Sequence, residues 1–178
     1  MMKIAIINGS ISKKSIHEHI ANFIVAQFPA EVSTHKVTIS DLPLYTQDLD
    51  AEVVPSYDRV RSEIKEADAV LILTPEHNRS MPAALKNVID IGSRPYGQGA
   101  WTNKKVAVVT ASPGTYGGLT CSLQVRQSLQ MLNAQILQAP EVCLARFSGL
   151  NDNGNIIDER TSAFLKQFAD TFINWVKA

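Results

Sequence analysis

The sequence predicts an α/β fold, with a doubly wound parallel sheet of five strands in the order 2-1-3-4-5 and helices on both faces. Short β-branched apolar runs alternate with longer segments of helical period, which is typical of βα units rather than hairpins. Several runs are apolar throughout, as expected for strands that are covered on both faces. For five such strands, 2-1-3-4-5 is a common order.

Five segments are the expected strands, and each is bounded by polar or turn-forming residues. They are KIAII (3–7), KVTI (36–39), AVLIL (69–73), KVAVV (105–109) and the weaker AQILQAPEVCL (134–144). The first of them is too short for a signal peptide or a membrane span.

Apolar side chains recur at helical spacing between and after these strands, and we interpret them as core-facing stripes. The stripes are Ile16, Ile20, Phe23, Ile24 and Phe28; Leu119, Leu123, Leu129 and Leu132; and Phe164, Leu165, Phe168, Phe172 and Trp175. No repeat or linker interrupts the pattern, so we expect one domain over residues 1–178.

Composition excludes several classes of function. Lysine plus arginine and aspartate plus glutamate both number 17, so no strong charge favours binding to nucleic acid or an anionic membrane. Cys121 and Cys143 have neither a CxxC spacing nor a suitably spaced histidine. This pattern favours a reduced, cytoplasmic protein without a metal site.

The predicted strand order places the chemistry in three loops. Strands 1, 3 and 4 are neighbours in this order, and ligands of such sheets bind beyond the carboxyl ends of the strands where the winding reverses. The loops that follow these strands are NGSISKKS, TPEHNRSMP and TASPGTYGG. All three are rich in polar and turn residues, so we expect them to form one site.

The first loop indicates a phosphate site. It lacks the glycines of the dinucleotide and Walker A motifs, which points to a smaller group. Ser10, Ser12 and Ser15 offer hydroxyl donors, the next helix offers free N–H groups, and Lys13 or Lys14 adds charge. A terminal phosphate monoester fits this set. The alternative is that Ser15 only caps the helix, with a glutamate three residues later.

The second loop is expected to be stiff. Pro75 ends the strand, Asn78 tolerates unusual backbone angles, and Pro82 can open the next helix. Such a loop can aim main-chain groups at the polar edge of a flat heterocycle. Glu76 and His77 could instead act as an acid and base pair, or His77 could simply pack or stack.

The third loop is expected to approach a ligand closely. Gly114, Gly117 and Gly118 permit positive φ angles, while Tyr116 offers a ring face or a hydroxyl and Ser112 another polar group. A simple turn into a helix would use the same glycines. No GxSxG motif occurs, which argues against a serine hydrolase.

The segments NGSISKKSIH, LTPEHNRSMPAALKNVID and SPGTYGG, with DLPLYTQDLD after the second strand, resemble the NADPH-dependent FMN reductases of flavodoxin-like fold. This group includes chromate, quinone and azo-dye reductases. The resemblance implies an FMN site, with the phosphate near the first loop and the isoalloxazine ring between the other two. The implied residues are Ser10, Ser12, Ser15, Ile16 and His17; Thr74, Pro75, Glu76, His77 and Asn78; and Ser112, Gly114, Tyr116, Gly117 and Gly118.

Four positions depart from the family pattern, which usually has arginine at Ser12, glycine at Lys14, asparagine at His17 and tyrosine at His77. A nearby lysine could replace the arginine only as a point charge. A protonated His17 could donate to phosphate, so we hypothesise that FMN retention weakens as pH rises through the histidine range.

The resemblance implies an NAD(P)H oxidoreductase that passes hydride through FMN to quinones, azo compounds, metal oxyanions or free flavin by a ping-pong mechanism. The cofactor performs this chemistry, so no catalytic side chain is expected. Arg79, Arg94 and Lys104 are candidates for the 2′-phosphate of NADPH, although NADH remains open and surface cations are often only solvated.

A homodimer or homotetramer is also expected. The stretch DLPLYTQDLDAEVVP carries apolar side chains that suit an interface, and Arg126 in an apolar helix could pair across one. Two other functions remain open: a flavodoxin-type electron carrier, and an interaction protein that has kept the fold without flavin.

Overall fold

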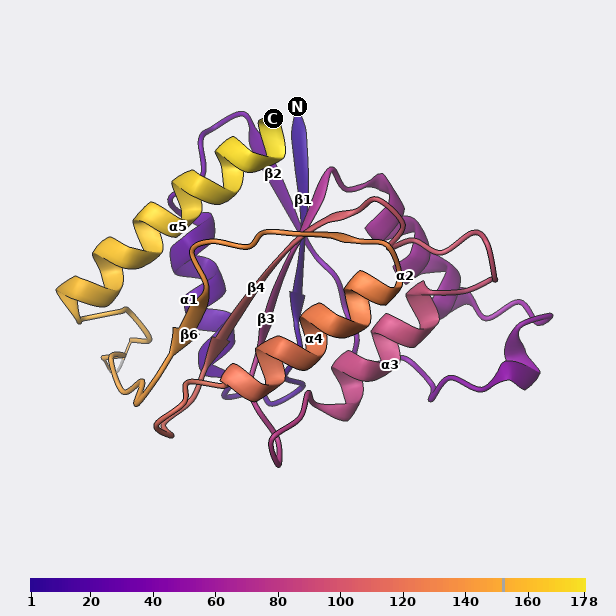
Figure 1. Ribbon diagram of the computed structural model, residues 1–178, viewed down its shortest axis with the longest axis horizontal. Helices are drawn as coiled ribbons and strands as arrows, with labels where there is room; N and C mark the ends of the chain where they lie inside the picture. The colour runs from indigo at the N-terminus through magenta and orange to yellow at the C-terminus, as the bar shows by residue number, and fades with distance from the viewer. Residues whose placement is uncertain (152) are drawn as a thin grey trace.

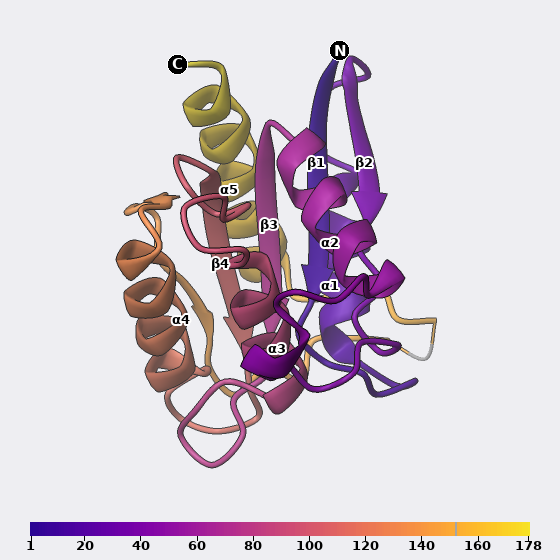
Figure 2. The same ribbon diagram turned by 90° about the vertical axis from the view of Figure 1, so that its right-hand side faces the viewer.

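The computed structural model describes residues 1–151 and 153–178. Its centre is a parallel sheet in the order β2-β1-β3-β4-β5, which confirms the predicted order (Figures 1 and 2). A further short strand, β6, pairs with β4. The strands are β1 (Met2–Asn8), β2 (Val32–Lys36), β3 (Ala69–Thr74), β4 (Lys105–Ala111), β5 (Gln135–Ile136) and β6 (Val142–Leu144).

Helices cover both faces of the sheet, as predicted (Figure 2). The helices are α1 (Ile16–Val25), α2 (Pro55–Glu66), α3 (Ala83–Gly92), α4 (Leu119–Met131) and α5 (Glu159–Lys177), with a short 3-10 helix η1 (Gln47–Leu49). Side chains of α2, α3 and α4 form one core cluster with the sheet. Those of α1 and α5 form the second cluster on the opposite face.

β3 lies between β1 and β4, and all six of its residues, AVLILT, are buried. Leu71 pairs with Ile6 of β1 on one side and with Ala107 of β4 on the other. Successive side chains of a strand point to opposite faces, so Val70 and Leu71 enter different core clusters. The continuous apolar run therefore reflects helices on both sides.

The second strand begins earlier than predicted. It spans Val32–Lys36 and pairs only with β1, whereas the sequence predicted residues 36–39. An edge strand can be polar on its exposed face, and Thr34, His35 and Lys36 are exposed. The apolar Val37 and Ile39 are buried, but they lie beyond the strand's end.

The last predicted strand is interrupted. β5 and β6 occupy its two ends, and both pair with β4. Pro140 lies between them and has no N–H group to donate to a ladder. Residues 137–141 therefore do not continue the strand.

The apolar stripe of α4 also differs from the prediction. Its buried face carries Cys121, Val125 and Leu129, whereas Leu123 is 53% exposed. The predicted stripes of α1 and α5 are confirmed at their centres, where Ile20 and Phe168 are buried. Within the described residues, none of the helices combines the length and the apolar character needed to cross a membrane.

Candidate functional site

The loops after β1, β3 and β4 meet at the carboxyl ends of these strands and line a pocket of about 240 Å³. Nine of the expected residues line it: Ser10, Ser12, Ser15, Ile16, His17, Pro75, Glu76, His77 and Ser112. The pocket is also lined by Lys14, Ala111 and Pro113. The remaining expected residues lie outside this lining: Thr74 is the last residue of β3, and Asn78, Gly114, Tyr116, Gly117 and Gly118 lie in the loops.

The first loop is held by hydrogen bonds from main-chain N–H groups to its own side chains. Asn8 Oδ1 accepts from the N–H of Ser10 at 3.0 Å, and Ser10 Oγ accepts from that of Ser12 at 3.3 Å. Ser12 Oγ accepts from the N–H of Lys14 at 3.3 Å. A hydroxyl that accepts in this way keeps its own hydrogen for another acceptor. The Ser10 and Ser12 hydroxyls are therefore suited to an anion.

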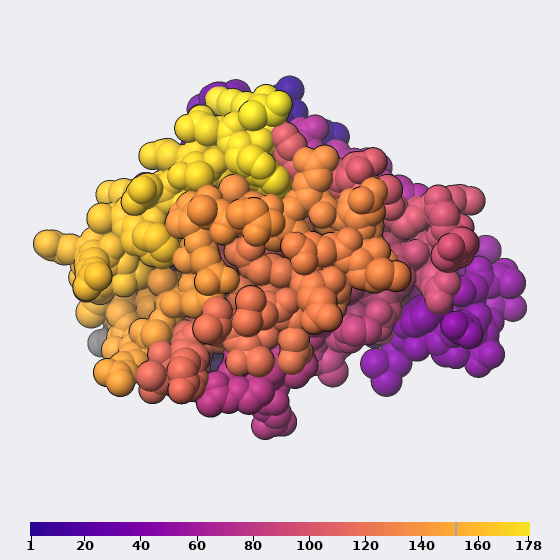
Figure 3. Space-filling model, viewed as in Figure 1, coloured from indigo at the N-terminus to yellow at the C-terminus, as the bar shows by residue number. Residues whose placement is uncertain are grey.

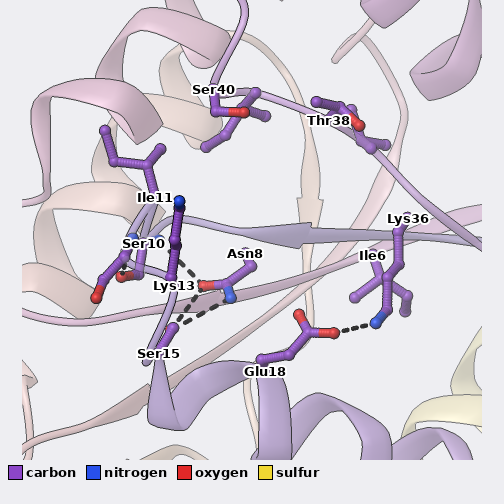
Figure 4. Close-up of a pocket in the computed structure, with 13 residues that line it drawn as sticks. Ile6, Asn8, Ser10, Ile11, Lys13, Ser15, Glu18, Lys36, Thr38 and Ser40 are labelled. Atoms are coloured by element: carbon purple, nitrogen blue, oxygen red, sulfur yellow. Dashed lines mark hydrogen bonds and ion pairs between the residues drawn. The ribbon is translucent and has the colours of Figure 1, made fainter.

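Asn8 organises this loop, and the sequence reasoning missed it. Its side-chain N–H group donates to Ser15 Oγ at 3.3 Å. Figure 4 shows this bond in a second hollow, which is lined by the first loop and by residues 36–40. An asparagine at the end of a strand, whose side chain accepts from the main-chain N–H two residues later, is a known turn signal. That signal was available in the segment NGS.

The start of α1 leaves main-chain donors free. Ser15 occupies the N-cap position, but its side chain does not cap the helix. Glu18 forms an ion pair with Lys36 and does not reach back, so the alternative interpretation as a capping box is wrong. Within the described residues, the N–H groups of Ile16 and His17 have no hydrogen-bond acceptor. Free N–H groups at a helix N-terminus attract anions.

His17 is buried and neutral at physiological pH. Its side chain is 2% exposed, and Nε2 lies 3.2 Å from the carbonyl oxygen of Ala111. A carbonyl can only accept, so Nε2 carries the hydrogen. Burial lowers the pKa of His17 to about 4, against the smaller raising effect of this bond. Without a ligand, His17 therefore titrates below the usual histidine range, and the hypothesis that FMN retention weakens as pH rises stays a prediction.

The second loop contains a tight two-residue turn. His77 and Ser80 exchange two main-chain hydrogen bonds of 2.9 Å, while Asn78 and Arg79 between them have φ angles of 51° and 64°. Gln124 of α4 holds the turn, because it accepts from Ser80 Oγ at 2.6 Å and donates to the Arg79 carbonyl at 3.1 Å. The loop has the ordered backbone that its sequence predicted.

Glu76 and His77 do not form an acid and base pair. One carboxylate oxygen of Glu76 accepts from the N–H of Cys121 at 3.1 Å, in the first turn of α4, and the other lies 3.5 Å from the Arg79 guanidinium. His77 is exposed. Thr74 is fully buried behind the pocket, where its hydroxyl donates to the carbonyl of Pro75 at 3.0 Å.

The glycines of the third loop serve the chain's own packing. Gly117 and Gly118 have φ angles of 58° and 83°. A Cβ atom at Gly117 would lie 2.7 Å from the Cys143 carbonyl oxygen, and one at Gly118 would lie 2.8 Å from Thr110 Cβ. The expected positive φ angles are confirmed, but the close approach is to β4 and β6.

An aromatic contact joins the second and third loops. Tyr116 is 57% exposed, and the Arg79 guanidinium lies 4.9 Å from its ring centroid. This distance is within the range of a cation–π interaction. A Cβ atom at Gly114 would meet only the Ser112 hydroxyl within 4 Å, at 3.2 Å, so this part of the third loop is more open.

Of the three cations considered for a 2′-phosphate, only Arg79 lies in a site loop. Lys104 precedes β4, at the opposite end of the strand, and bonds the carbonyls of Lys65 and Ala67. Arg94 contacts Tyr45 and Asp50, in the segment that follows β2.

Arg126 does not need a partner chain. It is 8% exposed, donates to the carbonyl of Leu137 at 3.2 Å and to Ser122 Oγ at 3.4 Å, and lies 3.9 Å from Glu141. These contacts fix the segment between β5 and β6. These contacts within the chain account for the buried Arg126 charge, and its pairing across an interface stays a prediction.

Sheet order and loop convergence together define a flavodoxin-like α/β protein with a pocket at the carboxyl ends of its strands that is lined by free hydrogen-bond donors. The chain belongs to the NADPH-dependent FMN reductase family, whose sequence model matches residues 2–149. It is thus an oxidoreductase of a class that uses FMN with NAD(P)H.

Relatives and a solved structure agree with this family. The chain is 44% identical to a quinone reductase of Pseudomonas putida over 175 residues, covering 98% of this chain and 94% of the relative. It is 35% identical to a 2-hydroxy-1,4-benzoquinone reductase of Burkholderia sp over 177 residues, covering 99% and 97%. The flavoenzyme NAD(P)H:(acceptor) oxidoreductase FerB of Paracoccus denitrificans superposes with a TM-score of 0.92 at 32% identity, covering 99% and 98%.

Proposed function

We propose that residues 1–178 form one FMN-binding domain that reduces quinones, azo compounds, metal oxyanions or free flavin with electrons from NAD(P)H. The observation that carries this proposal is the meeting of three loops in one pocket that has hydroxyl and main-chain donors on one side. The similarity to two reductases of quinones favours quinones among these acceptors.

The FMN phosphate would be held by the first loop. The hydroxyls of Ser10 and Ser12 and the N–H groups of Ile16 and His17 supply uncharged donors. Lys14 lines the same pocket and supplies a positive charge. This set replaces the arginine that the family usually has at Ser12, with a point charge instead of a planar fork.

The isoalloxazine ring would lie between the second and third loops. The stiff turn fixes the main chain of residues 75–78, and Ser112 and Pro113 face it across the pocket. The volume of about 240 Å³ is below that of a pocket that encloses a whole ligand of this size. One face of the ring would therefore stay accessible.

An accessible face supports a ping-pong mechanism. When bound, FMN accepts hydride from the nicotinamide and delivers it to the acceptor. The protein's part is to hold the ring so that each partner can stack against the same face in turn. Glu76 and His17 have structural roles in this scheme, because Glu76 accepts from the N–H of Cys121 at the start of α4 and His17 donates to the Ala111 carbonyl.

We also propose a cytoplasmic homodimer or homotetramer. α4, on the face seen in Figure 3, exposes Leu123 by 53% and Met131 by 84%, and the segment after β2 exposes Leu44 by 76%. Large apolar side chains grouped on one helix are typical of interfaces. Light scattering after gel filtration measures the molar mass of the assembly. Wild type should have the mass of a dimer or tetramer, and Leu123→Glu should have a lower mass than wild type. A monomeric wild type would contradict it.

The experiment for function uses the purified full chain loaded with FMN and freed of excess flavin. Anaerobic NADPH or NADH should bleach the flavin absorbance, and a quinone should restore it. Plots of reciprocal rate against reciprocal nicotinamide concentration, made at several quinone concentrations, should be parallel if the mechanism is ping-pong. A flavin that nicotinamides cannot bleach would indicate an electron carrier, and a chain that cannot be loaded would indicate an interaction protein.

Matched serine variants test the site itself. Ser12→Ala should raise the dissociation constant of FMN about tenfold, because a hydrogen bond to a charged group contributes roughly 1.5–3 kcal/mol. Ser62→Ala is the control, since Ser62 is exposed on α2 and lines neither the pocket nor the hollow of Figure 4. Equal FMN affinity in both variants, measured by quenching of flavin fluorescence, would contradict the proposed phosphate site.

A further inference from the structure

A groove lies beside the third loop, between the segment that follows β6 and the start of α5. Its volume is about 710 Å³, within the range of sites for nucleotide-sized ligands. Figure 1 shows this segment leaving the end of β6 and leading into α5 at the side of the sheet. The groove is not part of the pocket described above, with which it shares no lining residue.

Main-chain hydrogen bonds tie the segment after β6, which lines the groove, to the loop after β4, which lines the FMN pocket. The N–H of Arg146 donates to the carbonyl of Gly114 at 2.9 Å, and that of Phe147 donates to the carbonyl of Ser112 at 3.0 Å. The N–H of Ser112 donates in turn to Leu144 at 3.0 Å. One side of the groove is thus tied to the loop whose Ser112 lines the pocket.

The lining combines two cations with two aromatic rings. Arg146 and Arg160 are exposed, and Phe147 and Phe164 are half-buried against the core. Arginine presents planar donors that match phosphate oxygens, and an aromatic face can stack on a purine. Arg146 holds its position with a φ of 51°, which is uncommon for a residue other than glycine or asparagine.

The carboxylate in the groove is already engaged. Asp158 caps α5 by accepting from the N–H of Thr161 at 2.7 Å, and hydrogen bonding by the Thr161 side chain and then by its N–H lowers the pKa of Asp158. Arg160 lies close enough to Asp158 to lower its pKa slightly further. Two arginines against one aspartate leave the groove net positive, so it favours an anion.

We propose that this groove binds the phosphorylated adenosine end of the nicotinamide dinucleotide while the nicotinamide reaches the FMN pocket. The inference rests on the proposed function and assigns a place to the part of the co-substrate that the small pocket cannot hold. Arg146 and Arg160 bind phosphate groups, and the phenylalanines offer a face to adenine. A 2′-phosphate adds charge that these arginines favour, so the groove prefers NADPH to NADH.

The test measures binding as well as activity. Titration calorimetry of the FMN-loaded protein with adenosine 2′,5′-bisphosphate reports on the groove without any hydride transfer. Arg146→Asn keeps a residue that tolerates the left-handed backbone, and Arg160→Gln removes the second charge. Each should weaken binding of the bisphosphate about tenfold or more and raise the half-saturating NADPH concentration for flavin bleaching similarly. The half-saturating NADH concentration should rise less.

Two controls separate this inference from the proposed function. Lys166→Gln removes an exposed positive charge from α5 outside the groove and should leave the bisphosphate affinity unchanged. FMN affinity and bleaching by dithionite should be the same in all variants. Bleaching by NADPH that is unaffected by Arg146→Asn and Arg160→Gln would overturn the groove while leaving the reductase intact. The proposed dinucleotide site would also be overturned if the arginine variants changed only the half-saturating concentration of the quinone and not that of NADPH.

Discussion

Acidification should destabilise this protein through His17. The imidazole is 2% exposed, and its pKa is about 4 in the folded chain, compared with 6.5 for an unperturbed histidine. The unfolded chain therefore binds a proton more tightly than the folded chain. The stabilisation is complete above the unfolded pKa and is lost as pH falls through the folded pKa.

The magnitude follows from these two pKa values. Each unit of difference corresponds to about 1.4 kcal/mol, so the lowered pKa makes the folded state roughly 3 kcal/mol less stable at pH 4 than at pH 7. This is a large share of the stability of an ordinary domain, which is about 5–15 kcal/mol. Urea unfolding followed by circular dichroism at several values between pH 4 and 7 measures it.

The comparison with His17→Gln isolates the effect. Glutamine can offer an N–H group to the Ala111 carbonyl but does not titrate. The exposed carboxylates of Glu31 and Asp158, whose pKa values are lowered, also lose stabilisation in acid, but they do so in both proteins. Wild type should therefore lose about 3 kcal/mol more than the variant between pH 7 and 4. Identical losses would refute the assignment of a buried, neutral imidazole.

Three further results are expected. Gly117→Ala should lower the free energy of unfolding by about 2–4 kcal/mol, because the new Cβ would lie 2.6 Å from the Ala145 nitrogen. Gly97→Ala is the control: its φ is also positive, at 77°, but no atom lies within 4 Å of the new Cβ. In the same urea assay it should lower the free energy of unfolding by only about 1 kcal/mol. Glu76→Gln should cost about 0.5–1 kcal/mol by weakening the interaction with the start of α4, and an unchanged melting temperature would contradict that contact. Cys121, whose pKa burial raises to about 11, should react with iodoacetamide at pH 8 only after unfolding, so mass spectrometry that finds it labelled in the native protein would contradict its burial.

The central strands were predictable because burial on both faces leaves a continuous apolar run. This signal is complete in β3 and nearly so in β4. At the edges it disappears: β2 is polar and exposed, so the sequence placed the strand on the buried Val37 and Ile39 instead. The buried face of α4 was predicted incorrectly for a related reason, because the polar residues Ser122 and Arg126 occupy buried positions there.

The three site loops were predictable from the strand order, but the contacts within them were not. Serines and glycines in a loop can bind a ligand or pack against the rest of the chain, and the sequence does not distinguish these two roles. The hydroxyls of the first loop keep a free hydrogen, whereas Gly117 and Gly118 are required by β4 and β6. The burial of His17 depends on Ala111, which is 94 residues away, so no local pattern could reveal it.

The division of the last sheet position into β5 and β6 makes that border of the sheet the first to open. β5 pairs with β4 at only two positions, whereas β3 is paired along its length on both sides. Amide protons of Gln135 and Ile136 should therefore exchange with deuterium through local fluctuations, long before those of β3, which require global unfolding. We therefore expect the slowest exchange directly beneath the pocket that the three loops form.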